Sequence, residues 1–408
     1  MKRKVETGVL PNGLQIVHCQ IPSAVAYSGL TVNVGTRDEL VGEHGLAHFL
    51  EHLLFKGTKK RKAYHINNRL ESVGGELNAY TTKEETVVHA ATLSGDFSKA
   101  VELIADVAFS SVFPEVELQK EKEVIIDEID SYLDSPAEAI FDDFEEFIFA
   151  DSPLGRNILG DKNNIRKLTA QHLQDFVSRH YSPDKMVFSS VGRMSFSKVY
   201  KLAERYFAQY PSRSLGQQRV APPLYRPFNK RQSKGTHQAH CVLGVRSYPI
   251  SDKRITGLML LANLLGGPSS NSRLNTSLRE KHGLVYNVEA SCTPYEDTGL
   301  LNIYFGTSKG ALDSALSFTL EELQKLRTVR LTELQLGRAK KQLVGQLAIA
   351  NESWEQLMLS LGKSLLSLER IDTPEETLAK INAVTPGMLI EIANELFDPD
   401  SLSTLIYT

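Results

Sequence analysis

Cysteine is scarce in this chain, which limits what can hold the fold together. Only Cys19, Cys241 and Cys292 occur among 408 residues, odd in number and far apart. They show neither the paired spacings of a thiolate zinc site nor those of a disulfide framework. We therefore expect a reducing compartment and a fold that depends on its hydrophobic core.

Long apolar segments and a large net charge are also missing. The longest apolar run, residues 257–267, is about half the length that spans a bilayer, and Asn263 interrupts it. The net charge is −3, and no basic domain or sustained basic run is present. The sequence therefore argues against a membrane span and against nucleic acid as a partner.

The N-terminus, Met1-Lys2-Arg3-Lys4, is basic like the start of a secretory signal. Val5-Glu6-Thr7-Gly8 follows, where such a signal would have its apolar stretch. We therefore expect no secretory signal and a cytoplasmic protein, although a mature organellar chain would look the same.

Length and composition favour a globular protein with more than one domain. The chain is 41% hydrophobic and 23% charged, and 408 residues correspond to two or three domains of about 150 residues. Residues 212–235 contain three prolines among glycine, serine, glutamine and basic residues, without sustained periodicity. This segment is typical of a linker, and it predicts two domains at 1–211 and 236–408.

The two halves resemble each other weakly, which indicates an internal duplication. Gly45-Leu46 matches Gly257-Leu258 at an offset of 212 residues (257 − 45), and Glu84-Glu85-Thr86 matches Glu296-Asp297-Thr298 at the same offset. Strand-like runs alternate with longer helix-like runs in each half. The clearest are 86–93, 300–305, 118–133 and 314–326. We predict an α+β fold of two similar domains, each an antiparallel or mixed sheet covered by helices.

A hairpin is expected at the start of the first domain. Leu10-Pro11-Asn12-Gly13-Leu14 places Asn-Gly between apolar residues, which favours a two-residue type I′ turn. The first domain is therefore predicted to begin with antiparallel strands.

A metal-binding motif, His48-Phe49-Leu50-Glu51-His52, lies in a segment whose apolar residues have helical spacing. At 100° per residue, the five apolar side chains of this segment fall within about 140° of the helix, whereas His48, Glu51 and His52 share the opposite face. Two imidazoles one turn apart can bind one cation, and the carboxylate between them can reach a water on it. Zinc suits two nitrogens and a carboxylate.

A catalytic zinc needs a third protein ligand and an open position for water. The acidic segment 121–130 offers five carboxylates. On a helical wheel Glu121 and Glu128 lie beside the inward apolar stripe, and the other three project to the opposite side. The residues alone leave both open as the third ligand, and a solvated helix flank would explain an isolated pair more simply.

These residues resemble the pitrilysin and insulinase family of inverted-motif zinc peptidases. Glu128 stands 76 residues (128 − 52) beyond the second histidine of the motif, which is the spacing of the family's third ligand. The resemblance implies that His48, His52 and Glu128 hold one zinc per chain and that Glu51 is the catalytic base. It implies that Glu121 supports the site without being a regular ligand. Chain length and Lys56-Gly57-Thr58 look closest to the processing-peptidase subgroup, which includes the mitochondrial β subunit.

The resemblance also implies a substrate site. The segment 279–286 matches the family's second-half segment that faces the zinc, so that Arg279 would hold substrate and Tyr286 would steady the oxyanion. The segment 76–81, with Asn78 and Ala79, matches the family's substrate-binding edge strand. From the residues alone, an ordinary half-buried strand is an equally good interpretation of that segment.

The second half has lost the metal motif. At the offset of 212 residues, the two histidines and the glutamate become Leu260, Leu264 and Asn263. The cluster His237-Gln238-Ala239-His240-Cys241 has helical spacing but runs into a strand-like segment, so we interpret it as structural. The second domain is thus predicted to bind no metal and to contribute substrate-binding residues.

The sequence therefore predicts a zinc-dependent endopeptidase acting on peptides or unfolded segments. Family members enclose substrate with four such domains, so a chain with two is expected to form a closed dimeric chamber. A homodimer is the simpler case, and a heterodimer with a homologous subunit stays open. A non-catalytic structural subunit and a metallo-hydrolase of another bond are the alternatives; the complete ligand set disfavours the first, and only the resemblance disfavours the second.

Overall fold

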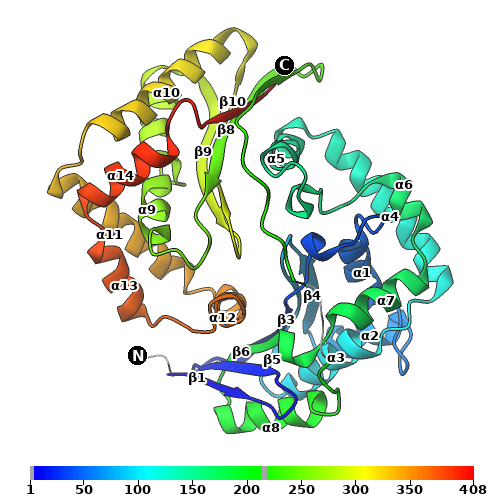
Figure 1. The fold of residues 1–408 in the computed structure, drawn as a ribbon. Coiled ribbons are helices and arrows are strands. Elements are labelled where there is room, and N and C mark those ends of the chain that lie inside the picture. Colours follow the sequence, from blue (N-terminus) through cyan, green and yellow to red (C-terminus); the bar gives the residue numbers. More distant parts are fainter. Residues whose placement is uncertain (1–3, 214–217) are drawn as a thin grey trace. The chain divides into compact units, whose positions relative to one another are not determined.

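The computed structural model describes residues 4–213 and 218–408, which form two compact units (Figure 1). Residues 1–3 of the basic N-terminus and residues 214–217 of the predicted linker lie outside the described residues. The described residues of the first unit fall within Met1–Asp130, Arg156–Val220 and Ala350–Ile371, and those of the second fall within Ser131–Gly155, Ala221–Ile349 and Asp372–Thr408. Each unit therefore includes a segment from the other half of the sequence.

The first unit is built on a six-stranded mixed sheet in the order β1-β2-β6-β3-β5-β4. The strands are β1 (Lys4–Val9), β2 (Gln15–Gln20), β3 (Val25–Val32), β4 (Glu76–Thr81), β5 (Thr86–Leu93) and β6 (Met186–Gly192). β2 and β6 pair in parallel, and all other neighbours are antiparallel. β4 pairs with β5 alone, so it is an edge strand.

Helices cover both faces of this sheet, because alternate residues of its central strands are apolar. In β6, Met186 and Phe188 belong to one core, and Val187 and Val191 belong to another. α3 and α8 pack on the first face and α12 on the second. The helices of the unit are α1 (Leu46–Leu54), α2 (Ala63–Glu71), α3 (Phe97–Ser110), α4 (Glu115–Leu133), α6 (Lys162–Lys167), α7 (Ala170–His180), α8 (Phe196–Phe207) and α12 (Trp354–Leu368).

The second unit contains a five-stranded sheet in the order β7-β11-β8-β10-β9. Its strands are β7 (Asn229–Gln232), β8 (Gln238–Ser247), β9 (Val285–Pro294), β10 (Gly299–Ser308) and β11 (Ser403–Tyr407). Its helices are α5 (Pro136–Ile148), α9 (Ile255–Gly266), the π-helix η4 (Asn275–Lys281), α10 (Leu312–Thr328), α11 (Glu333–Ala350), α13 (Pro374–Ala383) and α14 (Pro386–Leu396). The apolar run 257–267 lies almost wholly in α9, and none of the helices in the described residues is long and apolar enough to cross a membrane.

The second sheet repeats the arrangement of the first. Its order corresponds to β2-β6-β3-β5-β4, with the single parallel pair, β7 and β11, in the place of β2 and β6. The remaining neighbours are antiparallel in both sheets. The predicted α+β fold of two similar parts is therefore confirmed.

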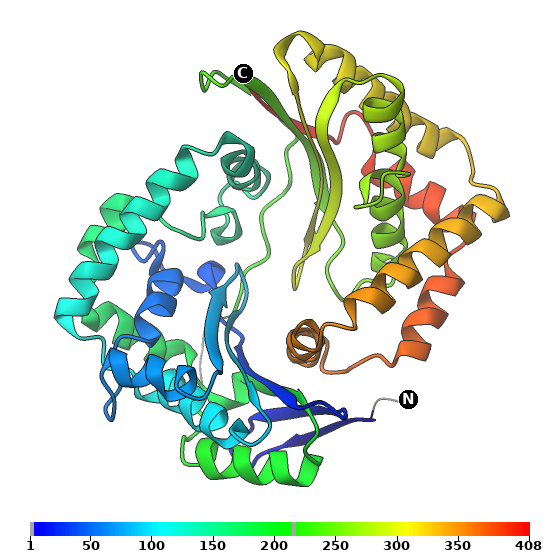
Figure 2. The same ribbon diagram turned by 180° about the vertical axis from the view of Figure 1, so that it is seen from behind.

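Two equivalent helices have exchanged sheets. α5 follows α4 in the first half of the chain, and α12 follows α11 in the second half. α5 nevertheless packs on β8 and β11, whereas α12 packs on β2, β3 and β6 (Figures 1 and 2). Each sheet is thus closed on one face by a helix from the other half of the sequence.

The close packing of α12 on its sheet gives a stability prediction. A Cβ atom at Gly362 would lie 2.7 Å from Thr31 Oγ1 and 3.1 Å from Ser189 Oγ. We expect Gly362→Ala to lower the free energy of unfolding by about 1–3 kcal/mol, as overpacking commonly does. Gly345→Ala on α11, where no atom lies within 4 Å, should raise it by about 0.5–1 kcal/mol. Urea denaturation of both variants checks this, and equal stabilities would contradict the packing argument.

The predicted N-terminal hairpin is present, but its turn differs from the prediction. β1 and β2 pair antiparallel, with Val9 opposite Gln15, so residues 10–14 form a longer loop. Only Gly13 has a positive φ there, +86°, whereas a type I′ turn needs positive φ at both central residues. The Asn12 side chain instead donates hydrogen bonds to the carbonyls of Phe207 and Tyr210, which holds the loop against the end of α8.

Candidate metal centre

The metal motif lies on α1, whose apolar face is buried in the core of the first unit. Leu46, Phe49, Leu50, Leu53 and Leu54 are each at most 1% exposed. Gly45 precedes the helix with φ of +88°, and a Cβ there would lie 2.7 Å from the Leu159 carbonyl oxygen. Gly45 therefore permits both the left-handed turn and the close approach of the chain that starts the helix.

Glu39 fixes the first turn of α1. Its buried carboxylate accepts hydrogen bonds from the backbone N–H groups of Gly45 at 3.1 Å and Ala47 at 2.9 Å. Burial raises the pKa of Glu39 to about 8, and the two hydrogen bonds and the charge of Arg156 oppose that rise. A carboxylate at this position satisfies N–H groups that would otherwise be unpaired at a helix N-terminus.

Removing this carboxylate should loosen the start of α1. We expect Glu39→Ala to lower the free energy of unfolding by about 2 kcal/mol, because it leaves buried N–H groups without acceptors. Glu71→Ala, at the exposed end of α2, is the matched control and should change stability by less than about 0.5 kcal/mol. Chemical denaturation of the metal-free protein measures both, and a loss at Glu39 no larger than the control would contradict the assigned role.

The three expected metal ligands converge from α1 and α4. Nε2 of His48 lies 3.9 Å from Oε2 of Glu128, and Nε2 of His52 lies 3.7 Å from the same oxygen. One ligand atom from each residue can be chosen so that all lie within 4.8 Å of one another, and no other such group occurs among the described residues. Tetrahedral zinc with bonds of about 2.0–2.2 Å separates its donors by roughly 3.4 Å. The donor set and the spacing therefore both fit zinc.

Glu121 orients His52 toward this cluster. Nδ1 of His52 donates a hydrogen bond to Oε2 of Glu121 over 3.2 Å, which leaves Nε2 as the nitrogen with a free lone pair. The other oxygen of Glu121 lies 2.7 Å from Nζ of Lys56, one turn further along the chain. Glu121 is thus a buried acceptor for His52, while the more exposed Glu128 lies at the open side of the cluster.

His48 is held in its neutral form. Burial, and secondarily the charge of His52, lowers the pKa of His48 to about 3. The residue is 8% exposed, and its Nδ1 has no hydrogen-bond partner. A neutral imidazole is the form that binds a metal ion, so the environment of His48 suits a ligand.

Glu51 has the electrostatic environment of a general base. Burial raises the pKa of Glu51, and the charge of Glu128 adds to the rise, whereas Thr81 and His52 lower it. Burial, and then the charge of Glu51, also raises the pKa of Tyr181, whose phenol is buried without a hydrogen-bond partner. A raised carboxyl pKa brings Glu51 closer to neutral pH, where proton exchange with a reacting group is most effective.

The predicted substrate strand lies beside α1, which carries the metal motif. Asn78 and Ala79 belong to the edge strand β4, opposite His89 and Val88 of β5. α1 packs against β4, and Ala79 contributes to the same core as the apolar face of α1. The outer side of β4 has no partner strand among the described residues, so its backbone groups on that side can pair with an added strand.

Arg279 and Tyr286 lie on irregular backbone in the second unit. Arg279 belongs to the π-helix η4. Tyr286, which is 62% exposed, is the extra residue of a β-bulge, because Asn287 pairs with Gly306 while Val285 pairs with Thr307. π-Helices and β-bulges are frequent at functional sites, where they redirect side chains. The roles of both residues toward the metal stay predictions.

Comparison with known proteins agrees with this fold and gives its family. Residues 16–162 match the family model described as insulinase (peptidase family M16), and residues 167–343 match the one described as the peptidase M16 inactive domain. The chain belongs to the insulinase family of peptidases, M16. The resemblance seen in the sequence is thereby confirmed at the level of the family, and the processing-peptidase subgroup stays a prediction.

Relatives and solved structures cover the whole chain. YmxG of Bacillus subtilis, named as an uncharacterized zinc protease, is 33% identical over 396 residues, which are 97% of this chain and 96% of that protein. An uncharacterized zinc protease of Rickettsia bellii is 33% identical over 411 residues, covering 100% and 98%. A protease from Helicobacter pylori has a similar fold, with a TM-score of 0.92 at 23% identity over 100% of both chains. The names of the two relatives support a zinc protease at the level of the family, and the solved structure supports the fold.

Proposed function

We propose that this chain is a zinc-dependent endopeptidase that hydrolyses peptides or unfolded segments, with one zinc per chain. The observation that carries the proposal is the convergence of two imidazoles and a carboxylate from α1 and α4, with Glu51 between the histidines. Nε2 of His48, Nε2 of His52 and a carboxylate oxygen of Glu128 would hold the metal. The names of the relatives, which cover nearly the whole chain, support the same conclusion.

The chemistry follows from the environment of Glu51. When bound, zinc polarises the scissile carbonyl and lowers the pKa of a bound water toward roughly 7. Glu51 accepts the proton of the attacking water and then donates it to the leaving amine, for which its raised pKa is suited. Glu121 keeps His52 in the tautomer that presents Nε2 to the metal.

Substrate recognition is proposed to use the edge of the first sheet. An extended peptide that pairs with β4 along Asn78 and Ala79 gains backbone hydrogen bonds beside α1, independently of most of its sequence. Arg279 would hold the substrate, and Tyr286 would donate a hydrogen bond to the developing oxyanion. These two roles follow from the family resemblance of the segment 279–286.

The active form is proposed to be a dimer that encloses its substrate in a chamber in the cytoplasm. A homodimer is preferred because this chain carries both the metal motif and the Arg279/Tyr286 segment, and a heterodimer with a homologous subunit is the second possibility. Sedimentation of the active protein measures the mass of the active form and so the number of chains in it. A mass equal to one chain would contradict both forms.

Hydrolysis of a library of quenched peptides by the purified full chain tests the proposed activity. We expect internal cleavage, located by mass spectrometry, that o-phenanthroline abolishes and added zinc restores. Cleavage only at peptide ends would contradict an endopeptidase. The absence of both cleavage and bound metal would favour the non-catalytic structural subunit, and bound zinc without cleavage would point to a missing partner subunit.

A further inference from the structure

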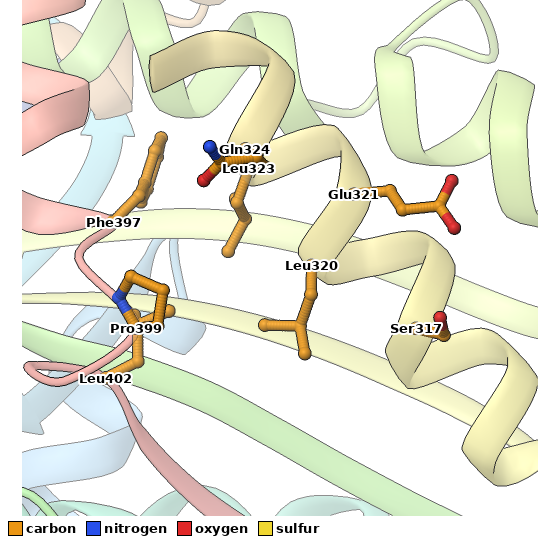
Figure 3. A pocket seen from close by; sticks show the side chains of 8 residues that line it. All are labelled: Ser317, Leu320, Glu321, Leu323, Gln324, Phe397, Pro399 and Leu402. Atoms are coloured by element: carbon orange, nitrogen blue, oxygen red, sulfur yellow. The ribbon is translucent and has the colours of Figure 1, made fainter. Parts of the chain in front are cut away.

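Side chains that can hold a metal ion come together at one place in the described residues, the group of His48, His52 and Glu128. The second unit has a cavity of about 330 Å³ along α10, but leucine, phenylalanine and proline side chains make up most of its lining (Figure 3). Of the eight described residues that line it, Glu321 alone can carry a charge, and its carboxylate points away from the apolar side chains. The choice of metal ligands is therefore made by the side chains around His48 and His52.

Two carboxylates of α4 face His52, and only one of them belongs to the proposed ligand set. Glu121 and Glu128 are seven residues (128 − 121), about two turns, apart. Oε2 of Glu121 lies 3.2 Å from Nδ1 of His52, and Oε2 of Glu128 lies 3.7 Å from Nε2 of the same ring. The two side chains have the same chemistry and the same length, so a further group must keep Glu121 away from the metal.

Lys56 distinguishes the two glutamates. It stands four residues after His52, just beyond the end of α1, and its Nζ lies 2.7 Å from Oε1 of Glu121. Each oxygen of Glu121 thus has a partner of its own, one on His52 and one on Lys56. Among the described residues, Glu128 forms ion pairs with His48 and His52 alone.

Burial strengthens the pair of Lys56 and Glu121. The side chain of Glu121 is 9% exposed and that of Lys56 is 30% exposed, so water and salt screen the pair less than they screen an ion pair on the open surface. A buried carboxylate that loses its cation is left with an uncompensated charge. A metal ion held by His48 and His52 would then be the nearest cation for Glu121.

We propose that Lys56 selects the metal ligand. By pairing with Glu121, Lys56 keeps this carboxylate as the hydrogen-bond acceptor of His52, so that Glu128 is the carboxylate that binds the metal and one position stays open for water. Lys56 is thus a positioning residue. The inference rests on the proposed zinc centre, but the coordination of the metal can be measured without any peptide cleavage.

Cobalt(II) in place of zinc is the probe, because four-coordinate cobalt absorbs visible light more strongly than five-coordinate cobalt. We expect the full chain with one bound cobalt to give a four-coordinate spectrum. Lys56→Met should lose about half or more of that absorption per bound cobalt, since Glu121 then enters the coordination as an extra ligand. Its zinc affinity, measured by competition with a chelator, should stay within about threefold of the wild-type value or rise, because no ligand is lost.

Three further variants assign the change to the pair of Lys56 and Glu121. Lys56→Arg should keep the four-coordinate spectrum, because a guanidinium also pairs with a carboxylate. The double variant Lys56→Met/Glu121→Gln, loaded with saturating cobalt, should regain that spectrum, because a neutral amide competes poorly for the metal. Lys60→Met makes the same change at an exposed lysine of the following loop and is the matched control, which should match the wild-type chain.

Peptide cleavage gives a second measurement on the same variants. Lys56→Met should lower kcat by at least about tenfold and leave KM within about twofold, because the extra ligand takes the position of the water and not that of the peptide. A wild-type chain that cleaves no peptide would contradict the proposed activity, whereas the cobalt spectra would still decide the role of Lys56.

Four results would overturn the proposed role of Lys56. Two concern the spectrum alone: unchanged absorption in Lys56→Met, and an equal loss in Lys60→Met. The third is a double variant that does not regain the wild-type spectrum, since Glu121 would then not be the added ligand. The fourth is a wild-type chain that binds no cobalt, which would overturn the proposed metal centre as well.

Discussion

Glu51→Gln is expected to retain bound zinc and to lose peptide hydrolysis by roughly 10²–10⁴-fold, the usual contribution of a general acid–base group. The amide keeps the size of the side chain but cannot accept the proton of the attacking water. Stability should not fall, since burial already disfavours the charged form of Glu51 and raises its pKa. Steady-state cleavage of a quenched peptide and metal analysis of the same sample measure the two properties together.

The control for Glu51→Gln is Glu123→Gln, which makes the same chemical change at an exposed position of α4. It should leave kcat/KM within about twofold of the wild-type value, as surface substitutions usually do. If Glu51→Gln kept zinc and full activity, Glu51 would not be the base. If it lost zinc, its side chain would serve metal binding rather than proton transfer.

Glu128→Ala is expected to weaken zinc binding by more than about 100-fold, because it removes one of the three proposed ligands. Glu121→Gln should weaken zinc binding by about 10–100-fold, which is the usual range for a residue that orients a metal ligand without binding the metal itself. Asp127→Ala changes the exposed neighbour of Glu128 and should have no effect. Competition with a chromophoric chelator gives the three affinities, and hydrolysis should fall in the same order.

The zinc affinities of the Glu121 and Glu128 variants show which of the two glutamates binds the metal. Helical spacing places Glu121 and Glu128 on the same side of α4 and cannot say which one binds metal. In the structure, Glu121 accepts from Nδ1 of His52 and pairs with Lys56, while Glu128 faces both Nε2 atoms. A larger loss for Glu121→Gln than for Glu128→Ala would reverse the assignment.

The sequence predicted those features of the fold and the site that depend on the spacing of residues along the chain. The apolar stripe of 45–56 indicated both the burial of α1 and the common face of His48, Glu51 and His52, because a helix places residues by their spacing alone. The duplicated fold was also visible, since matching segments recur at one offset. The edge position of β4 could be expected only from the family resemblance, as its residues equally suit an interior strand.

Tertiary contacts explain what the sequence could not predict. The periodicity of α5 and α12 shows that each has an apolar face, but not that each packs on the sheet of the other half. The Asn-Gly turn differs because Asn12 bonds to the distant carbonyls of Phe207 and Tyr210. Glu39 precedes His48 by a loop, and nothing in its neighbours signals that it would accept from the first turn of α1.

Titration of metal-free protein with zinc, with bound metal and peptide cleavage followed in the same samples, shows whether hydrolysis depends on a metal at His48, His52 and Glu128. We expect cleavage to rise in proportion to bound zinc and to stop rising at one zinc per chain, and we expect His52→Ala to show neither tight binding nor cleavage. Full cleavage by the metal-free chain, or unchanged zinc binding and cleavage in His52→Ala, would contradict a peptidase centre at His48, His52 and Glu128.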